Sequence, residues 1–296
     1  MEGRGIIYVM KKSGIVSLVG RPNAGKSTLL NNLVGTKVSI TSPRPQTTRF
    51  PVQAVLNEDR GQIVFVDTPG IFEKSVGPVV SLTNRLSYET LKEETDLILY
   101  VVDKTRPKGM EENKVLGITR KIDKPKILVI NKIDIKEPDF SADFEFLKDE
   151  FPEAVYISAL KGTNLRSLLD KIFEQLPEKD PIVPEKLETS ILNMDSKKFM
   201  EEIIREKVFL NTREELPYAI GVEVAEIVER QNGNLYVKAT ILVTEKRYKG
   251  MVIGKGGRII KEIGQAARKE LEVSTGKKVF VGLTVETDKH WIERLT

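Results

Sequence analysis

A glycine-rich run near the N-terminus has the residue types and the spacing of a phosphate-binding turn. It reads Gly20-Arg21-Pro22-Asn23-Ala24-Gly25-Lys26-Ser27, which matches G-x-x-x-x-G-K-[ST], and it lies between an apolar run and a helical apolar pattern. Glycines in that context let backbone N–H groups surround phosphate oxygens, and the following helix N-terminus favours negative charge. We expect Lys26 to reach the β- and γ-phosphates of a nucleotide and the Ser27 hydroxyl to bind Mg²⁺.

A second motif selects the base. Asn131-Lys132-Ile133-Asp134 follows the apolar run at 127–130, and it resembles the N-K-x-D signature of translation-factor-type GTPases. The Asp134 carboxylate can accept hydrogen bonds from the N1–H and N2–H₂ edge of guanine, whereas adenine lacks this pair of donors. The aliphatic stem of Lys132 can lie on the base. With the phosphate-binding turn, the motif predicts GTP and GDP as ligands.

A third motif concerns the metal and the γ-phosphate. Asp67-Thr68-Pro69-Gly70 follows the apolar run at 63–66 and resembles the D-x-x-G of these GTPases. The resemblance implies that Asp67 holds Mg²⁺ through water and that Gly70 lets the backbone approach the γ-phosphate. The stretch 36–50 is polar and rich in proline and threonine, which suits a loop that the nucleotide orders. Within it, Thr48 resembles the threonine that closes on Mg²⁺ and the γ-phosphate, and Thr47 is the alternative.

One departure concerns how the attacking water is oriented. Ras-like GTPases use a glutamine directly after D-x-x-G, and this chain has Ile71 there, so another stabiliser must act. Members of this subgroup use a potassium ion coordinated by an asparagine of the phosphate-binding turn, and the resemblance places Asn23 at that position. A weaker final motif, Ser158-Ala159-Leu160, resembles the segment in which a backbone N–H, here that of Ala159, meets guanine O6.

The expected nucleotide site combines these motifs. Its GTP-binding residues are Gly20, Arg21, Pro22, Asn23, Ala24, Gly25, Lys26, Ser27, Thr28, Asp67, Thr68, Pro69, Gly70, Ile71, Asn131, Lys132, Asp134, Ser158, Ala159 and Leu160. The residues on which we expect catalysis to depend are Lys26, Thr48, Asp67, Gly70 and Asn23. The expected ligands of Mg²⁺ are Ser27, Thr48 and Asp67, and Asn23 is the expected potassium ligand.

A separate glycine turn lies near the C-terminus. Val252-Ile253-Gly254-Lys255-Gly256-Gly257-Arg258-Ile259-Ile260 resembles the KH module, whose GXXG loop clamps about four nucleotides. Glycines let a sugar-phosphate backbone come close, and Lys255 with the following helix N-terminus attracts its charge. Between residues 246 and 269 the chain is strongly basic, with a single acidic residue, Glu262. The expected RNA-binding residues are Val252, Ile253, Gly254, Lys255, Gly256, Gly257, Arg258, Lys261, Lys246, Arg247, Lys249 and Arg268.

Short strands and amphipathic helices must hold these motifs. Apolar runs that predict buried strands of a mostly parallel sheet lie at 15–19, 63–66, 97–102, 127–130 and 155–157. Their alternation with helical patterns predicts a doubly wound α/β domain over residues 1–178. A proline-rich stretch predicts a linker over 179–188. The remaining residues, 189–296, predict an α+β domain similar to the type II KH arrangement, with a helix at 196–210 and strands at 221–230, 235–243 and 278–286.

The composition excludes several classes of function. The 296 residues include no cysteine, which excludes disulfides, thiolate metal sites and cysteine nucleophiles. The net charge of +4 allows an anionic partner without requiring one. The apolar runs at the N-terminus and at 97–102 are too short for a signal peptide or a membrane span. We expect a cytoplasmic protein with no transmembrane segment.

The order of the motifs covers nearly the whole chain and resembles the Era family of bacterial GTPases. The resemblance rests on G-R-P-N-A-G-K-S-T, P-Q-T-T-R, D-T-P-G-I, N-K-I-D and V-I-G-K-G-G. It implies a monomeric P-loop GTPase with a KH domain, slow potassium-stimulated hydrolysis of GTP, and a role in assembly of the small (30S) ribosomal subunit. It also implies binding of the 3′ end of 16S rRNA, no DNA partner, and weak peripheral contact with the inner membrane. The residues alone leave two alternatives: a related GTPase acting on a different RNA, and a phosphate-loop ATPase or kinase with a protein-binding KH-like domain.

Overall fold

The computed structural model describes residues 11–41, 49, 51–69, 95–184, 191–212 and 216–295. These residues divide into two compact units. The first unit contains the described residues up to 39, 51–69 and those from 95 to 192. The second contains residues 40, 41 and 49 and the described residues from 193 onward. Within the described ranges, every helix is too short or too polar to cross a bilayer.

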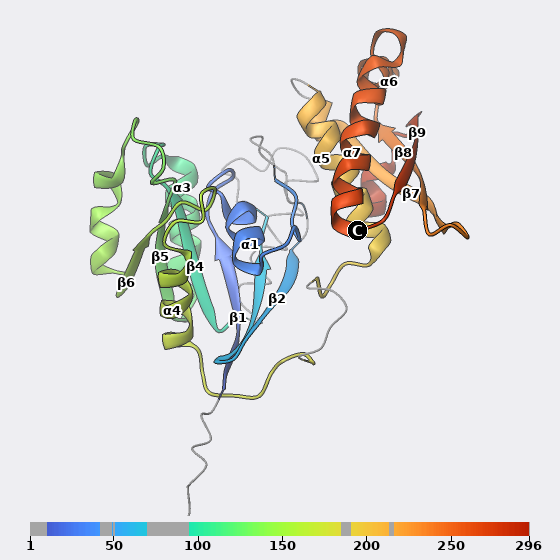
Figure 1. The fold of residues 1–296 in the computed structure, drawn as a ribbon. Helices are drawn as coiled ribbons and strands as arrows, with labels where there is room; N and C mark the ends of the chain where they lie inside the picture. Colours follow the sequence, from blue (N-terminus) through green and yellow to red (C-terminus); the bar gives the residue numbers. More distant parts are fainter. Residues whose placement is uncertain are drawn as a thin grey trace, which may run out of the picture. The chain divides into compact units, whose positions relative to one another are not determined.

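The first unit is built around a six-stranded sheet in the order β2-β3-β1-β4-β5-β6. Its elements are β1 (Lys12–Val19), α1 (Lys26–Val34), β2 (Val52–Glu58), β3 (Gly61–Asp67), β4 (Leu97–Asp103), α3 (Met110–Arg120), β5 (Lys126–Asn131), η1 (Ser141–Asp149), β6 (Glu153–Tyr156) and α4 (Leu165–Gln175). Every neighbouring pair is parallel except β2 and β3. Because parallel strands carry their connections on the faces of the sheet, helices cover both faces (Figure 1).

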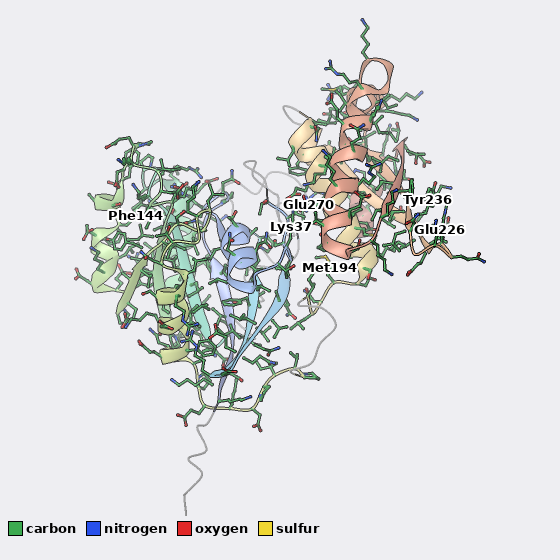
Figure 2. The ribbon with its side chains drawn as sticks, viewed as in Figure 1. Lys37, Phe144, Met194, Glu226, Tyr236 and Glu270 are labelled. Carbon is green, nitrogen blue, oxygen red and sulfur yellow. The ribbon has the colours of Figure 1, made fainter. Side chains whose placement is uncertain are left out.

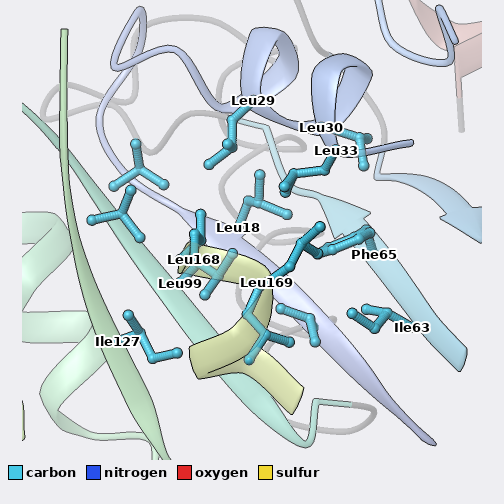
Figure 3. Close-up of a cluster of buried hydrophobic side chains, with 14 of the residues drawn as sticks. Leu18, Leu29, Leu30, Leu33, Ile63, Phe65, Leu99, Ile127, Leu168 and Leu169 are labelled. Carbon is cyan, nitrogen blue, oxygen red and sulfur yellow. The ribbon is translucent and has the colours of Figure 1, made fainter. Parts of the chain in front are cut away.

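Alternation along β4 divides the core of this unit between the two faces. Leu97, Leu99 and Val101 pack with residues of α1 and α4 on one face (Figure 3). Ile98, Tyr100 and Val102 pack with residues of α3 and η1 on the other, including Phe144, which Figure 2 labels. A strand buried on both sides must be apolar at every position, which explains the continuous run at 97–102. The carboxyl ends of β1, β3, β4 and β5 then meet at one edge of the sheet.

The second unit has a three-stranded sheet, β7-β8-β9. Its elements are α5 (Ser196–Asn211), η2 (Leu216–Ala219), β7 (Ile220–Glu229), β8 (Leu235–Val243), α6 (Lys246–Ile253), η3 (Lys255–Gly257), α7 (Arg258–Thr275), β9 (Val279–Thr287) and η4 (Trp291–Leu295). β8 is antiparallel to β7 and parallel to β9. The predicted strand at 235–243 is confirmed, and its alternate residues Leu235, Val237, Ala239, Ile241 and Val243 are all buried.

Residues from the N-terminal half of the sequence complete the second unit, among them Ile40 and Arg49. Ile40 lies in the cluster formed by α5, β7, β8, α7 and β9. Arg49 is buried, donates a hydrogen bond from Nη1 to the Ile220 carbonyl at 2.9 Å, and lies with its guanidinium carbon 5.2 Å from the Trp291 ring centroid. Gly221 leaves room for that ring, since a Cβ at this position would lie 2.7 Å from Trp291 Cε3.

The predicted fold class is confirmed, and two elements were missed. β2 is the antiparallel edge strand of the first sheet, and its end is polar (Asn57-Glu58), so it lacks the continuous apolar run of the other strands. α6 lies between β8 and the second glycine turn, where we predicted no helix. It buries only Tyr248 and Val252 and contains Gly250, so it shows little helical apolar periodicity.

Candidate functional site

The phosphate-binding turn lies between the end of β1 and the start of α1. A Cβ at Gly20 would lie 2.3 Å from the Val101 carbonyl oxygen, and a Cβ at Gly25 would lie 2.2 Å from Asn131 Nδ2. Gly25 also has φ of +98°, which other residues rarely adopt. The turn therefore requires glycine at both positions, and the sequence spacing alone identified them.

Lys26 lies inside this turn. Its Nζ donates hydrogen bonds to the Gly20 carbonyl at 2.9 Å and to the Arg21 carbonyl at 3.2 Å. Burial lowers the pKa of Lys26, while the nearby Asp67 and Glu112 carboxylates raise it. A desolvated ammonium held by loop carbonyls interacts strongly with any anion that enters the turn, since the local dielectric constant is low. This geometry fits a phosphate group.

Two of the three side chains expected to bind Mg²⁺, those of Ser27 and Asp67, lie together. Ser27 Oγ donates a hydrogen bond to Asp67 Oδ2 at 2.6 Å, and Ser39 Oγ donates to the same oxygen at 2.7 Å. Asn31 holds Ser39 in place, because its Oδ1 accepts from Ser39 N at 2.9 Å and its Nδ2 donates to the Ser39 carbonyl at 2.8 Å. Hydroxyl and carboxylate oxygens are the ligands that Mg²⁺ prefers, so this donor set fits the metal. Ser39 was missed, because it belongs to no motif.

Asn131 joins the base motif to the phosphate-binding turn and to the final motif at 158–160. Its Nδ2 donates to the Ala24 carbonyl at 2.8 Å, and its Oδ1 accepts from Lys132 N at 2.7 Å and from Ala159 N at 2.9 Å. Asp134 Oδ1 accepts from Ser158 Oγ at 2.6 Å. Residues from three separate parts of the sequence thus meet at one edge of the sheet, which the parallel topology predicts.

The Ala159 N–H differs from the expectation. We expected it to face guanine O6, but in the structure it donates to Asn131 Oδ1 at 2.9 Å. Contact with a base would require this hydrogen bond to be shared or broken. The next residue, Leu160, is 69% exposed, so its side chain lies where a ligand could cover it.

Arg21 also lies differently from a phosphate ligand. Its guanidinium is buried, donates to the carbonyls of Asp103, Arg106 and Pro107, and forms an ion pair with Glu112, with Nε and Oε2 3.1 Å apart. The side chain therefore supports the turn from behind, and only the backbone of Arg21 remains for phosphate contact. Burial lowers the pKa of Arg21, and Glu112 opposes that shift.

The remaining predicted residues fall into three groups. Thr47, Thr48, Gly70 and Ile71 lie outside the described residues. Pro22, Ala24, Thr68 and Pro69 are buried, and Thr68 Oγ1 donates to the Leu18 carbonyl at 2.7 Å. Asn23 and Thr28 are half-buried, and Asn23 has φ of +64°, an uncommon conformation for a residue other than glycine.

The second glycine turn connects two helices, α6 and α7 (Figure 1). Gly254, Gly256 and Gly257 have φ of +72°, +62° and +76°. A Cβ at Gly254 would lie 2.7 Å from Ile259 Cγ1, whereas a Cβ at Gly256 would meet nothing within 4 Å. Gly254 is thus required by packing, and Gly256 leaves an open surface at the tip of the turn.

The predicted basic residues lie in the turn and along the two helices that flank it, α6 and α7. The exposed ones are Lys246, Arg247, Lys249, Lys255, Arg258, Lys261 and Arg268. Their ion pairs with Glu245, Glu262 and Glu272 are also at exposed positions or nearly so, and such pairs are weak in water. Among the predicted RNA-binding residues, Val252 is the exception, because its side chain is fully buried in the core of the second unit. Its side chain packs beneath the turn, and Ile253 is packed against the same cluster.

Known protein families match both regions of the chain that contain a glycine turn. Residues 15–132 match the 50S ribosome-binding GTPase family, and residues 215–292 match the KH domain family. The chain is 42% identical to GTPase Era of Carboxydothermus hydrogenoformans over 285 residues, which are 95% of this chain and 94% of the relative. It is 41% identical to GTPase Era of Halothermothrix orenii, over 96% of this chain and 95% of the relative.

Solved structures give the same result. A crystal structure of Aquifex aeolicus Era, a variant bound to GDP and AlF4⁻, is 40% identical and superposes with a TM-score of 0.88 over 96% of each chain. A crystal structure of Era in complex with MgGDPNP and nucleotides 1506–1542 of 16S ribosomal RNA is also 40% identical, with a TM-score of 0.87 over 96% of each chain. Identity of this level over nearly the full length means that this chain belongs to the Era family of GTPases.

Proposed function

We propose that this protein is a GTP-hydrolysing switch that binds single-stranded RNA through a separate KH domain. The observation that supports the nucleotide half most directly is the set of hydrogen bonds from Asn131 to Ala24, Lys132 and Ala159. These bonds bring a phosphate-binding turn and a guanine-selective motif to the edge of one sheet. In this proposal the GTPase domain covers 1–178, the linker 179–188 and the KH domain 189–296.

The proposed roles follow from charge and position. Lys26 stabilises the β- and γ-phosphates, Ser27 and Asp67 hold Mg²⁺, and the Asp134 carboxylate reads the guanine edge. When bound, Mg²⁺ supplies positive charge next to the phosphates. Thr48, with Thr47 as the alternative, and Gly70 are proposed to complete the site around the γ-phosphate.

A potassium ion at Asn23 is the proposed substitute for the missing glutamine. Asn23 lies within the phosphate-binding turn, is half-buried, and has a left-handed backbone with φ of +64°. The expected result is faster GTP hydrolysis in potassium buffer than in sodium buffer, with loss of the difference in Asn23→Ala. Equal rates in the two salts would refute this role.

The proposed RNA target is the 3′ end of 16S rRNA, and the proposed role is assembly of the small ribosomal subunit. The support is a related Era structure in complex with nucleotides 1506–1542 of 16S ribosomal RNA, together with the basic, open surface at Gly256. In the proposed mechanism GTP orders the loops around Thr48 and Asp67, and hydrolysis releases them. By linkage, RNA must then change the affinity for GTP relative to GDP by the same factor that GTP changes the affinity for RNA.

Calorimetry with the intact chain in magnesium buffer tests the nucleotide half. We expect binding of GTP and GDP but not ATP, and we expect Asp134→Asn to shift the preference toward xanthine nucleotides. Binding of ATP, with no effect of Asp134→Asn, would support the ATPase or kinase alternative.

Titration with an oligonucleotide of the 16S rRNA 3′ end tests the RNA half. We expect tight, salt-dependent binding that differs between GDP and a GTP analogue and that Gly256→Asp removes. Unchanged binding by Gly256→Asp would support a protein-binding KH-like domain. Equally tight binding to an unrelated single strand would support action on another RNA.

A further inference from the structure

Asp103 lies beside the base motif without belonging to any signature. It is the last residue of β4, is fully buried, and is paired with Asn131 in the β4–β5 register. Its Oδ2 accepts a hydrogen bond from Lys132 Nζ at 2.6 Å, and its Oδ1 accepts from Thr105 Oγ1 at 2.7 Å and from Thr105 N at 2.9 Å. Both carboxylate oxygens are therefore fixed, and Lys132 balances the charge.

This ion pair fixes the Lys132 side chain at its far end. The near end is fixed as well, because Lys132 has φ of +68° and its N–H donates to Asn131 Oδ1 at 2.7 Å. A lysine on the surface normally samples many rotamers, and ordering such a side chain on binding costs free energy. With both ends fixed, the aliphatic stem presents one face before any base arrives.

Asp103 also contacts the phosphate-binding turn. Its backbone carbonyl accepts a hydrogen bond from Arg21 Nη2 at 3.3 Å, and the carbonyls of Arg106 and Pro107 accept from the same guanidinium at 3.1 Å and 3.0 Å. The segment 103–107 therefore contacts both parts of the site. The Asp103 side chain binds the Lys132 ammonium, and the backbone carbonyls of the segment bind the Arg21 guanidinium.

We propose that Asp103 is a positioning residue for guanine nucleotides. It fixes the Lys132 stem for contact with the base and sets the distance between that stem and the phosphate-binding turn. The proposal rests on the nucleotide site proposed above.

The test measures dissociation of a fluorescent methylanthraniloyl-GDP from the intact chain in magnesium buffer. Asp103→Asn keeps the size of the side chain and an acceptor for Thr105, but it removes the charge that holds Lys132. We expect dissociation about tenfold faster than from the unsubstituted chain. Lys132→Met keeps an apolar stem and removes the ammonium. If Asp103 acts through Lys132, adding Asp103→Asn to Lys132→Met should give no further acceleration.

Asp139→Asn is the matched control. Asp139 forms a similar ion pair with Lys104, the residue that follows Asp103, and its Oδ2 lies 2.8 Å from Lys104 Nζ. Among the described contacts, Asp139 touches no motif residue. Its loss should leave dissociation unchanged. Two results would overturn the proposal. One is an unchanged rate of GDP dissociation in Asp103→Asn. The other is that Asp103→Asn accelerates dissociation by the same factor in the Lys132→Met background as in the unsubstituted chain. Failure of the unsubstituted chain to retain GDP would overturn the proposed nucleotide site instead.

Discussion

Glu112 shows how a single buried carboxylate can support a loop that it does not belong to. It has no exposed surface, forms an ion pair with Arg21, and accepts a hydrogen bond from the Tyr100 hydroxyl at 2.5 Å. Burial raises the pKa of Glu112, while Tyr100 and Arg21 lower it. Because Arg21 is part of the phosphate-binding turn, Glu112 of α3 helps to fix that turn.

Replacing Glu112 by Gln should therefore destabilise the fold strongly. The change leaves the Arg21 guanidinium buried without its charged partner, and such losses cost about 3–5 kcal/mol. Tyr100→Phe is the control, since it removes one hydrogen bond and should cost about 1 kcal/mol. Urea unfolding of the nucleotide-free chain measures both values. Equal losses in the two variants would show that the Arg21 ion pair contributes nothing.

Asp103 makes stability depend on pH in a predictable direction. Burial alone would raise its pKa, but the hydrogen bonds from Lys132 and Thr105 outweigh burial and hold the pKa below the ordinary value. A carboxyl with a lowered pKa in the folded state stabilises the fold above its unfolded pKa of about 3.9, and this stabilisation is lost as the pH falls through the folded pKa. The decrease in unfolding free energy below about pH 4 should thus be shallower in Asp103→Asn than in the unsubstituted chain. Parallel curves from urea titrations over this range would contradict the assignment.

At the scale of the elements, two of the three glycines of the second turn, Gly254 and Gly256, have different roles: the first is required for packing and the second for an open surface. Gly254→Ala places a Cβ 2.7 Å from Ile259 Cγ1, whereas Gly256→Ala meets open space. Both positions have positive φ, so each alanine costs about 1 kcal/mol of backbone strain, and Gly254→Ala should cost about 1–3 kcal/mol more through overpacking. Thermal unfolding by circular dichroism measures this difference. Similar losses at the two positions would mean that Ile259 moves aside freely.

The same scale shows what the sequence can and cannot predict. β4 is buried on both faces and reads as a continuous apolar run, so it was predicted at nearly its full length, whereas the polar and glycine residues that begin β1 and β3 were missed. β2 ends in polar residues and α6 has few buried ones, so neither shows a clear period. Site residues inside motifs were predicted from spacing, and Asn131 lies where that spacing requires. Ser39, Asp103 and Glu112 could not be predicted, because each acts through a partner distant in sequence that only the folded sheet brings near.

At the scale of the whole molecule, the second unit is not a continuous segment of the chain. Ile40 is 4% exposed in a core cluster otherwise formed by residues from 199 onward. A fragment of residues 193–296 lacks this side chain and should be less stable than the second unit of the intact protein by about 1.5–3 kcal/mol. Calorimetric unfolding of the fragment and the intact chain measures this difference. The fragment also lacks Thr41 and Arg49, so Ile40→Ala in the intact chain isolates the part of the loss that belongs to Ile40. This variant should lower the unfolding transition of the second unit alone, and Ile98→Ala should lower that of the first unit alone. A fragment as stable as the intact unit would refute this role of Ile40.

Arg49 and Trp291 give the protein an optical reporter of its own. Trp291 is the single tryptophan of the chain and is 2% exposed, so its emission should be blue-shifted relative to that of an indole in water. A guanidinium against the ring makes the intensity sensitive to whether Arg49 is seated there. Stopped-flow fluorescence after mixing with nucleotide would thus follow the position of a residue from the stretch 36–50 without any attached dye, and Arg49→Leu would remove the signal.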